Sequence, residues 1–384
     1  MIKIPYGPDT VGIDLDADIV LPKKAESDEK EVLENCITAL KEFLGEKVTY
    51  IVNDNKRPTK TKKILDSIEL KPDDSILIAT GAHDHPGGNW IRENFGESNV
   101  HVHDARRSSF TYYGKTSFGN DVYLNSLIDD TEKIVAINSV EPHYFAGFTG
   151  GRKSFLPGIA KFETIERNHK HALNENARTL NLKGNPVHEE MMEVCSFVGE
   201  KKEVFGINLV QDLEDRIADI KYGDIKKSFY DACDTARKLF ATEIEKKYDT
   251  VISVAKHPMD INLYQSQKAM ENAKPALKNG GNLILVSKCS EGIGPSEFYN
   301  LLKSGTPEEV MEKIREGYRL GWHKTAKMIE ALRKYNLYAV TELPDNVLKA
   351  VGFIPWKLSD LEGIDGDVLV IPNGGITVPC FLLQ

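Results

Sequence analysis

The segment with the most potential for chemistry runs Glu141-Pro-His-Tyr-Phe-Ala-Gly-Phe-Thr-Gly-Gly-Arg-Lys153 and follows an expected strand. Its glycines allow tight turns and close approach of the backbone to a ligand. Successive backbone N–H groups in such a loop can form an anion nest, to which Arg152 and Lys153 would add positive charge. The spacing fits neither the Walker loop nor the dinucleotide fingerprint. The segment predicts a phosphate-binding loop of another kind, with an ordinary glycine-rich turn as the alternative.

Polar residues also follow two other expected strands, in the stretches Asn53-Asp-Asn-Lys-Arg57 and Thr80-Gly-Ala-His83-Asp-His85. Ligand crevices in α/β proteins open at the carboxyl ends of strands. The guanidinium of Arg57 is suited to holding a carboxylate through two parallel hydrogen bonds. Turn chemistry alone would also place Asp and Asn at such positions. His143 stands at a third strand end, where its role is either catalytic or structural.

The other histidines allow a metal-binding interpretation. His83-x-His85 and His101-x-His103 have the spacing of ligand pairs, because alternate strand residues share a face. No matching set of carboxylate and histidine residues completes a zinc site in the sequence. His169 lies in an expected helix without a ligand at i+4, so a metal bound there would need donors from elsewhere.

In the second half of the chain, the segment Asp260-Ile-Asn-Leu-Tyr264-Gln265-Ser-Gln-Lys268 is expected to open a helix. Tyr264 and Lys268 are separated by four residues and so share a helix face, with Gln265 beside them. At a helix start facing a cleft, these side chains would suit an anionic substrate. The alternative is that Lys268 only covers apolar surface.

Short β-rich runs alternate with helical runs, which indicates the α/β class. The expected strands are 48–53, 75–80, 100–103, 133–140, 203–209, 250–255, 282–286 and 367–371. The expected helices are 59–66, 163–173, 186–197, 230–245, 264–277, 306–316 and 324–334.

A chain of 384 residues is long for one core, so we expect two α/β domains. We interpret the charged helix expected over 230–245 as a connector between the two domains, because a new strand–helix–strand unit begins after it. We therefore predict a cofactor-binding and catalytic domain over 1–242 and a second domain over 243–371. Residues 372–384 are expected to return to the first domain. The active site is predicted in the cleft between the domains, where small-molecule sites concentrate.

The composition excludes several classes of protein. The net charge of −9 argues against a nucleic-acid-binding face. No stretch reaches the roughly 20 apolar residues of a membrane span, and the first residues lack the apolar core of a signal peptide. We therefore expect a cytoplasmic protein without nucleic-acid or membrane partners. The five cysteines are scattered, which predicts neither a disulfide framework nor a zinc knuckle.

Taken together, these segments resemble the nickel-dependent lactate racemase family. The motifs that carry the resemblance occur in family order and span most of the chain. They are Asn53-Asp-x-x-Arg57-Pro, Ala79-Thr-Gly-x-His83, Glu141-Pro-His-Tyr-Phe-Ala-Gly-Phe-x-Gly-Gly-x-Lys153, Asn168-His169 and Asp260-Ile-Asn-Leu-Tyr-Gln-x-Gln-Lys268.

The resemblance implies a nickel pincer nucleotide, a pyridinium mononucleotide whose two thio-acid arms hold Ni(II). It implies a covalent tether at Lys153 and a nickel ligand at His169, with the remaining three donors supplied by the cofactor. Protein made without the proteins that build this cofactor is expected to be the apoprotein. Further residues near the cofactor would be Asp54, Thr149, Gly150 and Gly151.

The resemblance also implies the reaction, which is inversion of C2 of a 2-hydroxyacid by hydride transfer to the cofactor. His83 and His143 would act as the two general acid–bases. Substrate contacts would come from Arg57, Tyr264, Gln265 and Lys268. The partners implied are a small 2-hydroxyacid and the cofactor-biosynthesis proteins.

The chain departs from the family pattern after His83, where Asp84-His-Pro-Gly stands instead of Arg-Pro. Arg106 and Arg107 add positive charge and suggest a second acidic group on the substrate, and Trp322 is a candidate aromatic contact. The alternatives to a racemase are a metal-dependent hydrolase or lyase using the His-x-His pairs and a non-catalytic cofactor-binding member of the same fold.

Overall fold

The computed structural model describes residues 1–25, 27–57 and 59–381; Pro58, part of the Arg57-Pro motif, falls outside them. The chain divides into two compact units. The middle unit comprises Lys24–Leu239, and the terminal unit comprises Met1–Lys23 together with Phe240–Gln384. Each unit contains its own six-stranded sheet.

In the middle unit the strand order is β13-β12-β9-β4-β5-β6. These strands are β4 (Val48–Asn53), β5 (Ser75–Ala79), β6 (Val100–Val102), β9 (Lys133–Ser139), β12 (Glu203–Gln211) and β13 (Ile217–Asp224). All neighbours are parallel except β12 and β13. The chain passes from β4 to β5 in one direction and later adds β9 on the other side of β4. The direction in which strands are added therefore reverses between β4 and β9, and crevices for ligands open at such switch points.

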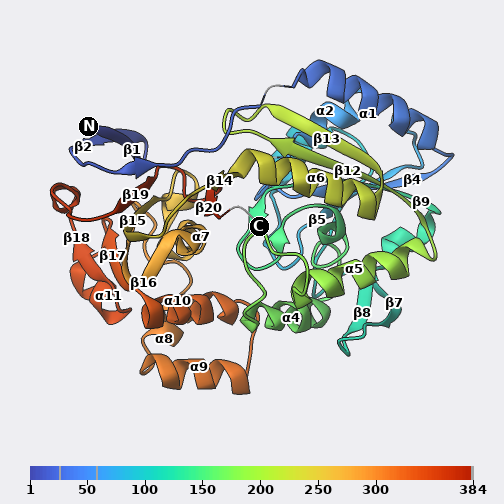
Figure 1. The fold of residues 1–384 in the computed structure, drawn as a ribbon. Coiled ribbons are helices and arrows are strands. Elements are labelled where there is room, and N and C mark those ends of the chain that lie inside the picture. Colours follow the sequence, from blue (N-terminus) through green and yellow to red (C-terminus); the bar gives the residue numbers. More distant parts are fainter. Residues whose placement is uncertain (26, 58, 382–384) are drawn as a thin grey trace. The chain divides into compact units, whose positions relative to one another are not determined.

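Helices cover both faces of this sheet. The helices α1 (Glu29–Phe43) and α2 (Thr61–Leu65) lie on one side, with α5 (Pro186–Gly199) and α6 (Ile225–Phe240) on the other (Figure 1). Because both faces are covered, β4 is buried along nearly its whole length, as expected for a parallel strand. Val48, Tyr50 and Val52 pack in the same cluster as Cys36 and Leu40 of α1.

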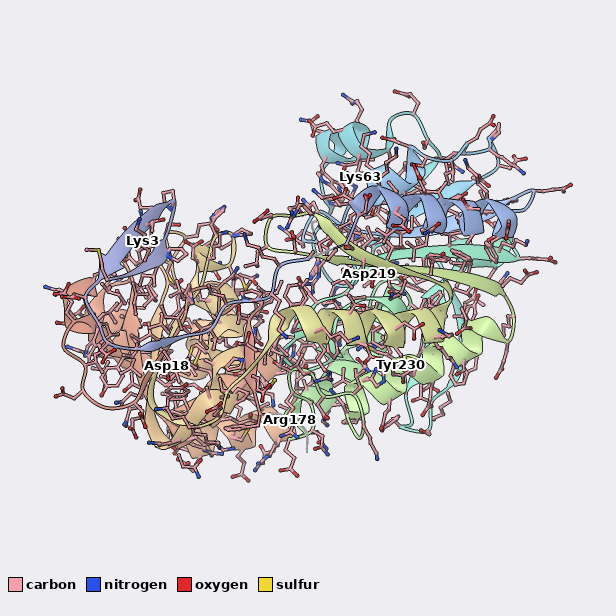
Figure 2. All side chains as sticks on the ribbon, turned by 45° about the horizontal axis from the view of Figure 1, so that its top comes forward. Lys3, Asp18, Lys63, Arg178, Asp219 and Tyr230 are labelled. Carbon is pink, nitrogen blue, oxygen red and sulfur yellow. The ribbon has the colours of Figure 1, made fainter. Side chains whose placement is uncertain are left out.

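Helix α6 differs from the helix predicted over 230–245. It begins five residues earlier because the carboxylate of Asp224 accepts hydrogen bonds from the backbone N–H groups of Lys226 and Lys227. It ends at Phe240, where strand β14 (Ala241–Glu243) begins. Tyr230, labelled in Figure 2, joins α6 to α5 because its hydroxyl lies 3.1 Å from Nε2 of His188.

Smaller elements complete the middle unit. They are α3 (Gly88–Phe95), β7 (Phe110–Lys115), β8 (Asp121–Asn125), β10 (Pro142–His143), β11 (Gly147–Phe148), the 3-10 turn η2 (Gly151–Ser154) and α4 (Phe162–Lys170). The turn η2 packs on the sheet through hydrogen bonds between the side chains of Ser154 and Asn138, 2.8 and 3.0 Å long.

The terminal unit has a fully parallel sheet in the order β18-β17-β16-β15-β19-β3. Its strands are β3 (Asp18–Ile19), β15 (Tyr248–Val254), β16 (Leu277–Val286), β17 (Asn336–Val340), β18 (Ile354–Trp356) and β19 (Val368–Ile371). The hairpin of β1 (Ile2–Tyr6) and β2 (Asp9–Ile13) packs on one face through Ile4 and Ile13. The helices are α7 (Leu263–Ala273), α8 (Ser296–Leu302), α9 (Pro307–Glu316), α10 (Trp322–Lys334) and α11 (Asp345–Ala350).

The α/β class is confirmed, but both ends of the chain lie elsewhere than predicted. Residues 1–23 belong to the terminal unit because β3 pairs with β19 and Asp18 (Figure 2) accepts a hydrogen bond of 2.9 Å from the hydroxyl of Tyr248. The predicted return of 372–384 to the first domain is also wrong for its described part. Strand β20 (Val378–Cys380) pairs with β14 inside the terminal unit, and 382–384 lie outside the described residues.

Two further features bear on the class of protein. Within the part of the chain that the structure describes, no helix has the length and apolar character to cross a membrane. Of the five cysteines, Cys36, Cys195, Cys233 and Cys289 are buried.

Candidate active site

Three loops gather the polar residues of the middle unit at one edge of its sheet. Asp54 and Arg57 follow β4, His83 follows β5, and Glu141 and His143 follow β9. Because β4 lies between β5 and β9, the loop that carries Arg57 follows the middle strand of the three, and the loops that carry the two histidines follow its two neighbours. The three loops at this edge, which includes the switch point between β4 and β9, therefore carry two potential bases and one cation.

His83 is oriented by a buried carboxylate. Its Nδ1 lies 2.7 Å from Oδ2 of Asp54, whose side chain is only 2% exposed, whereas 53% of the His83 side chain is accessible. The other oxygen of Asp54 accepts a hydrogen bond from the backbone N–H of Lys56. A carboxylate can only accept at Nδ1, so the neutral ring carries its hydrogen there and leaves Nε2 as a proton acceptor.

His143 is buried and held on both of its ring nitrogens. Nδ1 accepts a hydrogen bond of 3.2 Å from the backbone N–H of Ala146, and Nε2 lies 3.1 Å from Nζ of Lys153. The ring also stacks on Tyr144 and meets the edge of Phe145. Two of the residues predicted for the site, His143 and Lys153, are thus in direct contact.

Phe145 links this pair to His169. Nζ of Lys153 lies 5.6 Å from the centroid of the Phe145 ring, and the His169 ring meets that ring edge-on at 5.2 Å. Burial, followed by the positive charge of Lys153, lowers the pKa of His169 to about 3. The imidazole is therefore neutral at physiological pH, which is the form that binds metal ions.

Arg57 forms an ion pair with a carboxylate of the protein. Its Nη1 lies 2.7 Å from Oε1 of Glu141, and both side chains are partly buried. The sequence motif contains Glu141, but nothing in its spacing indicates that the two residues are partners. The cation proposed for a substrate carboxylate is thus paired with a carboxylate of the protein.

The glycine-rich loop is held together by Arg152, contrary to the prediction that this cation faces a phosphate. Arg152 is completely buried, and it donates hydrogen bonds to the carbonyls of Ala146, Phe148, Thr149 and Gly150. Burial lowers its pKa to about 10. The guanidinium organises the backbone of the loop.

The glycines of this loop serve close packing of the protein itself. Gly150 and Gly151 have φ values of +85° and +47°, and a Cβ at these positions would lie 2.4 Å from Val140 and 2.7 Å from Phe229. The N–H of Gly151 donates to the side chain of Asn208 at 2.8 Å. Contacts of Thr149, Gly150 and Gly151 with a cofactor stay a prediction.

The His-x-His pairs do not form metal sites. His103 is buried, where its Nε2 lies 3.0 Å from the carbonyl of Ala160, and burial lowers its pKa to about 4. His101 is exposed beside Asn99, and His85 accepts a hydrogen bond from the backbone N–H of Gly87. Among the described residues no group of three or more His, Cys, Asp or Glu side chains could hold a metal. The structure therefore gives the metal-dependent hydrolase hypothesis no ligand set.

In the terminal unit, Tyr264, Gln265 and Lys268 lie in the first turns of α7, as predicted. The helix is capped by Asn262, whose side chain accepts a hydrogen bond of 2.9 Å from the N–H of Gln265. All three predicted side chains are partly exposed.

Lys324 of α10 is a neighbour that sequence reasoning missed. Its Nζ donates a hydrogen bond of 2.6 Å to the carbonyl of Tyr264 and lies 3.7 Å from the centroid of the Tyr264 ring. Burial, together with the charge of Lys268, lowers the pKa of Lys324 well below its usual value. Trp322, the candidate aromatic contact, is the first residue of the same helix.

Comparison with known proteins agrees with this architecture. Residues 9–180 match the lactate racemase N-terminal domain, and residues 244–378 match the lactate racemase C-terminal domain. The chain is 34% identical over 347 residues to lactate racemase from Thermoanaerobacterium thermosaccharolyticum, covering 82% of this chain and 80% of that protein. It is 29% identical over 323 residues to lactate racemase from Lactiplantibacillus plantarum, covering 78% and 75% of the two chains.

Solved structures show the same fold. The lactate racemase apoprotein from Thermoanaerobacterium thermosaccharolyticum superimposes with a TM-score of 0.89 at 27% identity, covering 98% of this chain and 99% of that chain. A protein from Thermotoga maritima matches with a TM-score of 0.72 at 17% identity, over 94% and 99% of the two chains, which bears on the fold alone. These relatives place the chain among the racemases, which are isomerases. More narrowly, the chain belongs to the lactate racemase family.

Proposed function

We propose that this racemase inverts C2 of a 2-hydroxyacid, using a nickel pincer nucleotide held by Lys153 and His169. The observation that supports the proposal is the strand order β9-β4-β5, in which the loop of Arg57 follows the middle strand and the loops of His83 and His143 follow its two neighbours. Racemisation needs a proton acceptor on each face of a substrate whose carboxylate is held in one place. The names of the two relatives support lactate as one such substrate.

The residues present suit this cofactor. His169 offers a neutral imidazole as a metal ligand, and Lys153 offers an amine near the same aromatic ring. Since no described group of three protein ligands could hold a metal, nickel at His169 requires donors from a bound molecule. A cofactor that brings three donors and leaves one position for imidazole meets that requirement.

The protein's own groups perform the proton transfers. Nε2 of His83 accepts the hydroxyl proton of one enantiomer, and Asp54 stabilises the imidazolium that results. We assign the matching proton transfer for the other enantiomer to His143, whose neutral ring must then carry its hydrogen on Nδ1 in place of accepting the N–H of Ala146 there. Arg57 holds the carboxylate so that only the groups at C2 exchange places. When bound, the cofactor supplies reversible hydride acceptance from C2.

We further assign Tyr264, Gln265 and Lys268 to substrate binding, and Asp54, Thr149, Gly150 and Gly151 to the surroundings of the cofactor. The proteins that build the cofactor are the proposed macromolecular partners. The proposal covers the small-molecule class of 2-hydroxyacids, of which lactate is the first to test.

Labelled substrate tests the reaction. Protein produced together with the cofactor-building proteins is incubated in ordinary water with lactate deuterated at C2. Hydride transfer predicts that the label stays on C2 as the substrate racemises, because a transferred hydride does not exchange with solvent. If a histidine instead removed a C2 proton, deuterium would pass to water during racemisation, since imidazolium protons exchange readily. That result would reject hydride transfer in this protein.

A further inference from the structure

We propose that Glu141 is a specificity-determining and positioning residue of the carboxylate subsite. It fixes the direction of the Arg57 guanidinium, and its charge limits the subsite to ligands with a single carboxylate. This inference rests on the proposed role of Arg57 in holding the substrate carboxylate. The observation behind it is the 2.7 Å contact between Nη1 of Arg57 and Oε1 of Glu141.

The ion pair differs from an ordinary surface pair in its exposure. The side chains of Arg57 and Glu141 are 21% and 33% exposed, so solvent screens their interaction less than it screens a fully exposed pair. A guanidinium carries five N–H donors in a fixed plane, and this contact uses one of them. The opposite edge of the plane has the geometry for a second carboxylate, held by two parallel hydrogen bonds.

Both partners are anchored to the loops that carry the proposed catalytic groups. The backbone N–H of Glu141 donates to Oγ1 of Thr149, and the N–H of Thr149 donates to the carbonyl of Glu141, each at 2.9 Å. On the other side, the N–H of Arg57 donates to the carbonyl of Asp54 at 3.1 Å, and the Asp54 carboxylate orients His83.

The pair therefore joins the loop after β4 to the loop after β9. The first loop contains the carboxylate that orients His83, and the second contains His143. Any change in the direction of the guanidinium moves the substrate carboxylate relative to both histidines. Such misplacement lowers the rate of the chemical step as well as binding.

The negative charge of Glu141 also affects which acids the subsite binds. Glu141 neutralises Arg57, so a bound monocarboxylate meets a near-neutral pair, and a dicarboxylate brings one more negative charge toward Glu141. The extra arginines act on other groups: hydrogen bonds from the backbone N–H groups of Arg106 and Arg107, followed by the charge of Arg107, lower the pKa of Asp104, and Arg106 contacts an aromatic ring. The guanidinium of Arg106 lies 3.4 Å from the Phe162 ring, and the backbone N–H groups of Arg106 and Arg107 are bonded to Asp104. We infer that the subsite prefers monocarboxylates such as lactate over dicarboxylates such as malate.

Two substitutions separate charge from position. Glu141→Gln removes the charge and keeps an oxygen that can accept a hydrogen bond from Arg57, whereas Glu141→Leu removes both at similar volume. Arg57→Ala serves as the reference for the subsite itself. Dissociation constants for L-lactate and malate are measured by calorimetry on the full-length protein without cofactor, and KM and kcat for lactate on the cofactor-loaded protein.

For Glu141→Gln we expect lactate to bind about 3- to 10-fold more tightly, the range for two unit charges roughly 7 Å apart in a partly exposed site. Malate should gain by a larger factor than lactate, and kcat should fall less than in Glu141→Leu, because the amide oxygen still accepts a hydrogen bond from Arg57. For Glu141→Leu the gain in binding should disappear and kcat should fall, because the guanidinium has lost its acceptor.

Suppose that Glu141→Gln binds both acids as tightly as the unmodified protein or more weakly, and that Arg57→Ala weakens the binding of both. This result would overturn the role of the Glu141 charge and leave the proposed function intact. Identical kcat values for Glu141→Gln and Glu141→Leu would overturn its role in positioning. If Arg57→Ala changed neither affinity nor KM, the carboxylate subsite of the proposed function would itself be wrong.

Discussion

Replacing Asp54 by Asn tests whether the buried carboxylate makes His83 a base. The substitution keeps the size of the side chain and an oxygen that accepts from the N–H of Lys56. At the position 2.7 Å from Nδ1 of His83, however, an amide nitrogen can only donate. The ring then carries its hydrogen on Nε2 and faces the substrate hydroxyl with the wrong atom. The variant also lacks the negative charge that stabilises the imidazolium.

The size of the effect follows from the geometry. Hydrogen bonds to charged groups contribute about 1.5–3 kcal/mol. Since 53% of the His83 side chain is accessible, solvent screening favours the lower end of this range. A loss of about 1.5 kcal/mol corresponds to a decrease of about 10-fold in kcat. Each turnover uses both bases, so kcat should fall in both directions of racemisation.

The neighbouring exposed residue provides the control for this experiment. Asp84→Asn makes the same chemical change one residue from His83, at an exposed position, and should leave kcat unchanged. Initial rates from each pure enantiomer, followed by chiral chromatography, give the comparison. A kcat for Asp54→Asn equal to that of Asp84→Asn would refute the assignment of the pair as an acid–base unit.

Two further predictions concern the cofactor and the buried side chain of Lys324. Intact mass and peptide mapping of cofactor-loaded protein should place an adduct on Lys153 that is absent from Lys153→Ala, and an adduct on another lysine would contradict the tether. The variant His169→Ala should keep the adduct but lose nickel. The control variant His171→Ala should keep both. The folded chain holds the pKa of Lys324 well below 10.5, whereas the unfolded chain does not. Between the two pKa values the unfolded state therefore binds one more proton than the folded state. The free energy of unfolding should then rise by up to ~1.4 kcal/mol per pH unit as the pH increases toward 10.5. Denaturant midpoints at pH 7 and pH 10 should show a smaller rise for Lys324→Met, and equal slopes for the two proteins would show that Lys324 is charged in the folded state.

The central strands were predictable because their signal is local. Val48–Asn53 is an apolar run bounded by polar residues, and burial on both faces makes such a run unmistakable. The helix Pro186–Gly199 was predicted from its first residue because Asn185 and Pro186 form a cap and a first helical turn that the sequence spells out. Its end, two residues beyond the prediction, depends on packing instead.

Elements whose partners are distant in the sequence could not be predicted in this way. Strand β3 has two residues, both exposed, and forms only by pairing with β19, about 350 residues later. The burial of Arg152 and Lys324 has the same origin. From sequence alone a lysine or arginine is expected at the surface or in contact with a ligand. The carbonyl groups that accept hydrogen bonds from Arg152 and Lys324 are identified only once the folded loop and the neighbouring helix are known.

The site shows the same division between local and distant information. Each strand end could be recognised as polar from its own residues, and the type of side chain at position 57 was enough to suggest carboxylate binding. The proton-transfer roles of His83 and His143 were implied only by the family resemblance. Nothing local to these residues fixes which strand lies in the middle. The order β9-β4-β5 decides this, because it places the loop that carries Arg57 between the loops that carry the two histidines. The proposed action of both histidines on one bound carboxylate therefore depends on the sheet order as well as on the types of residue at the strand ends.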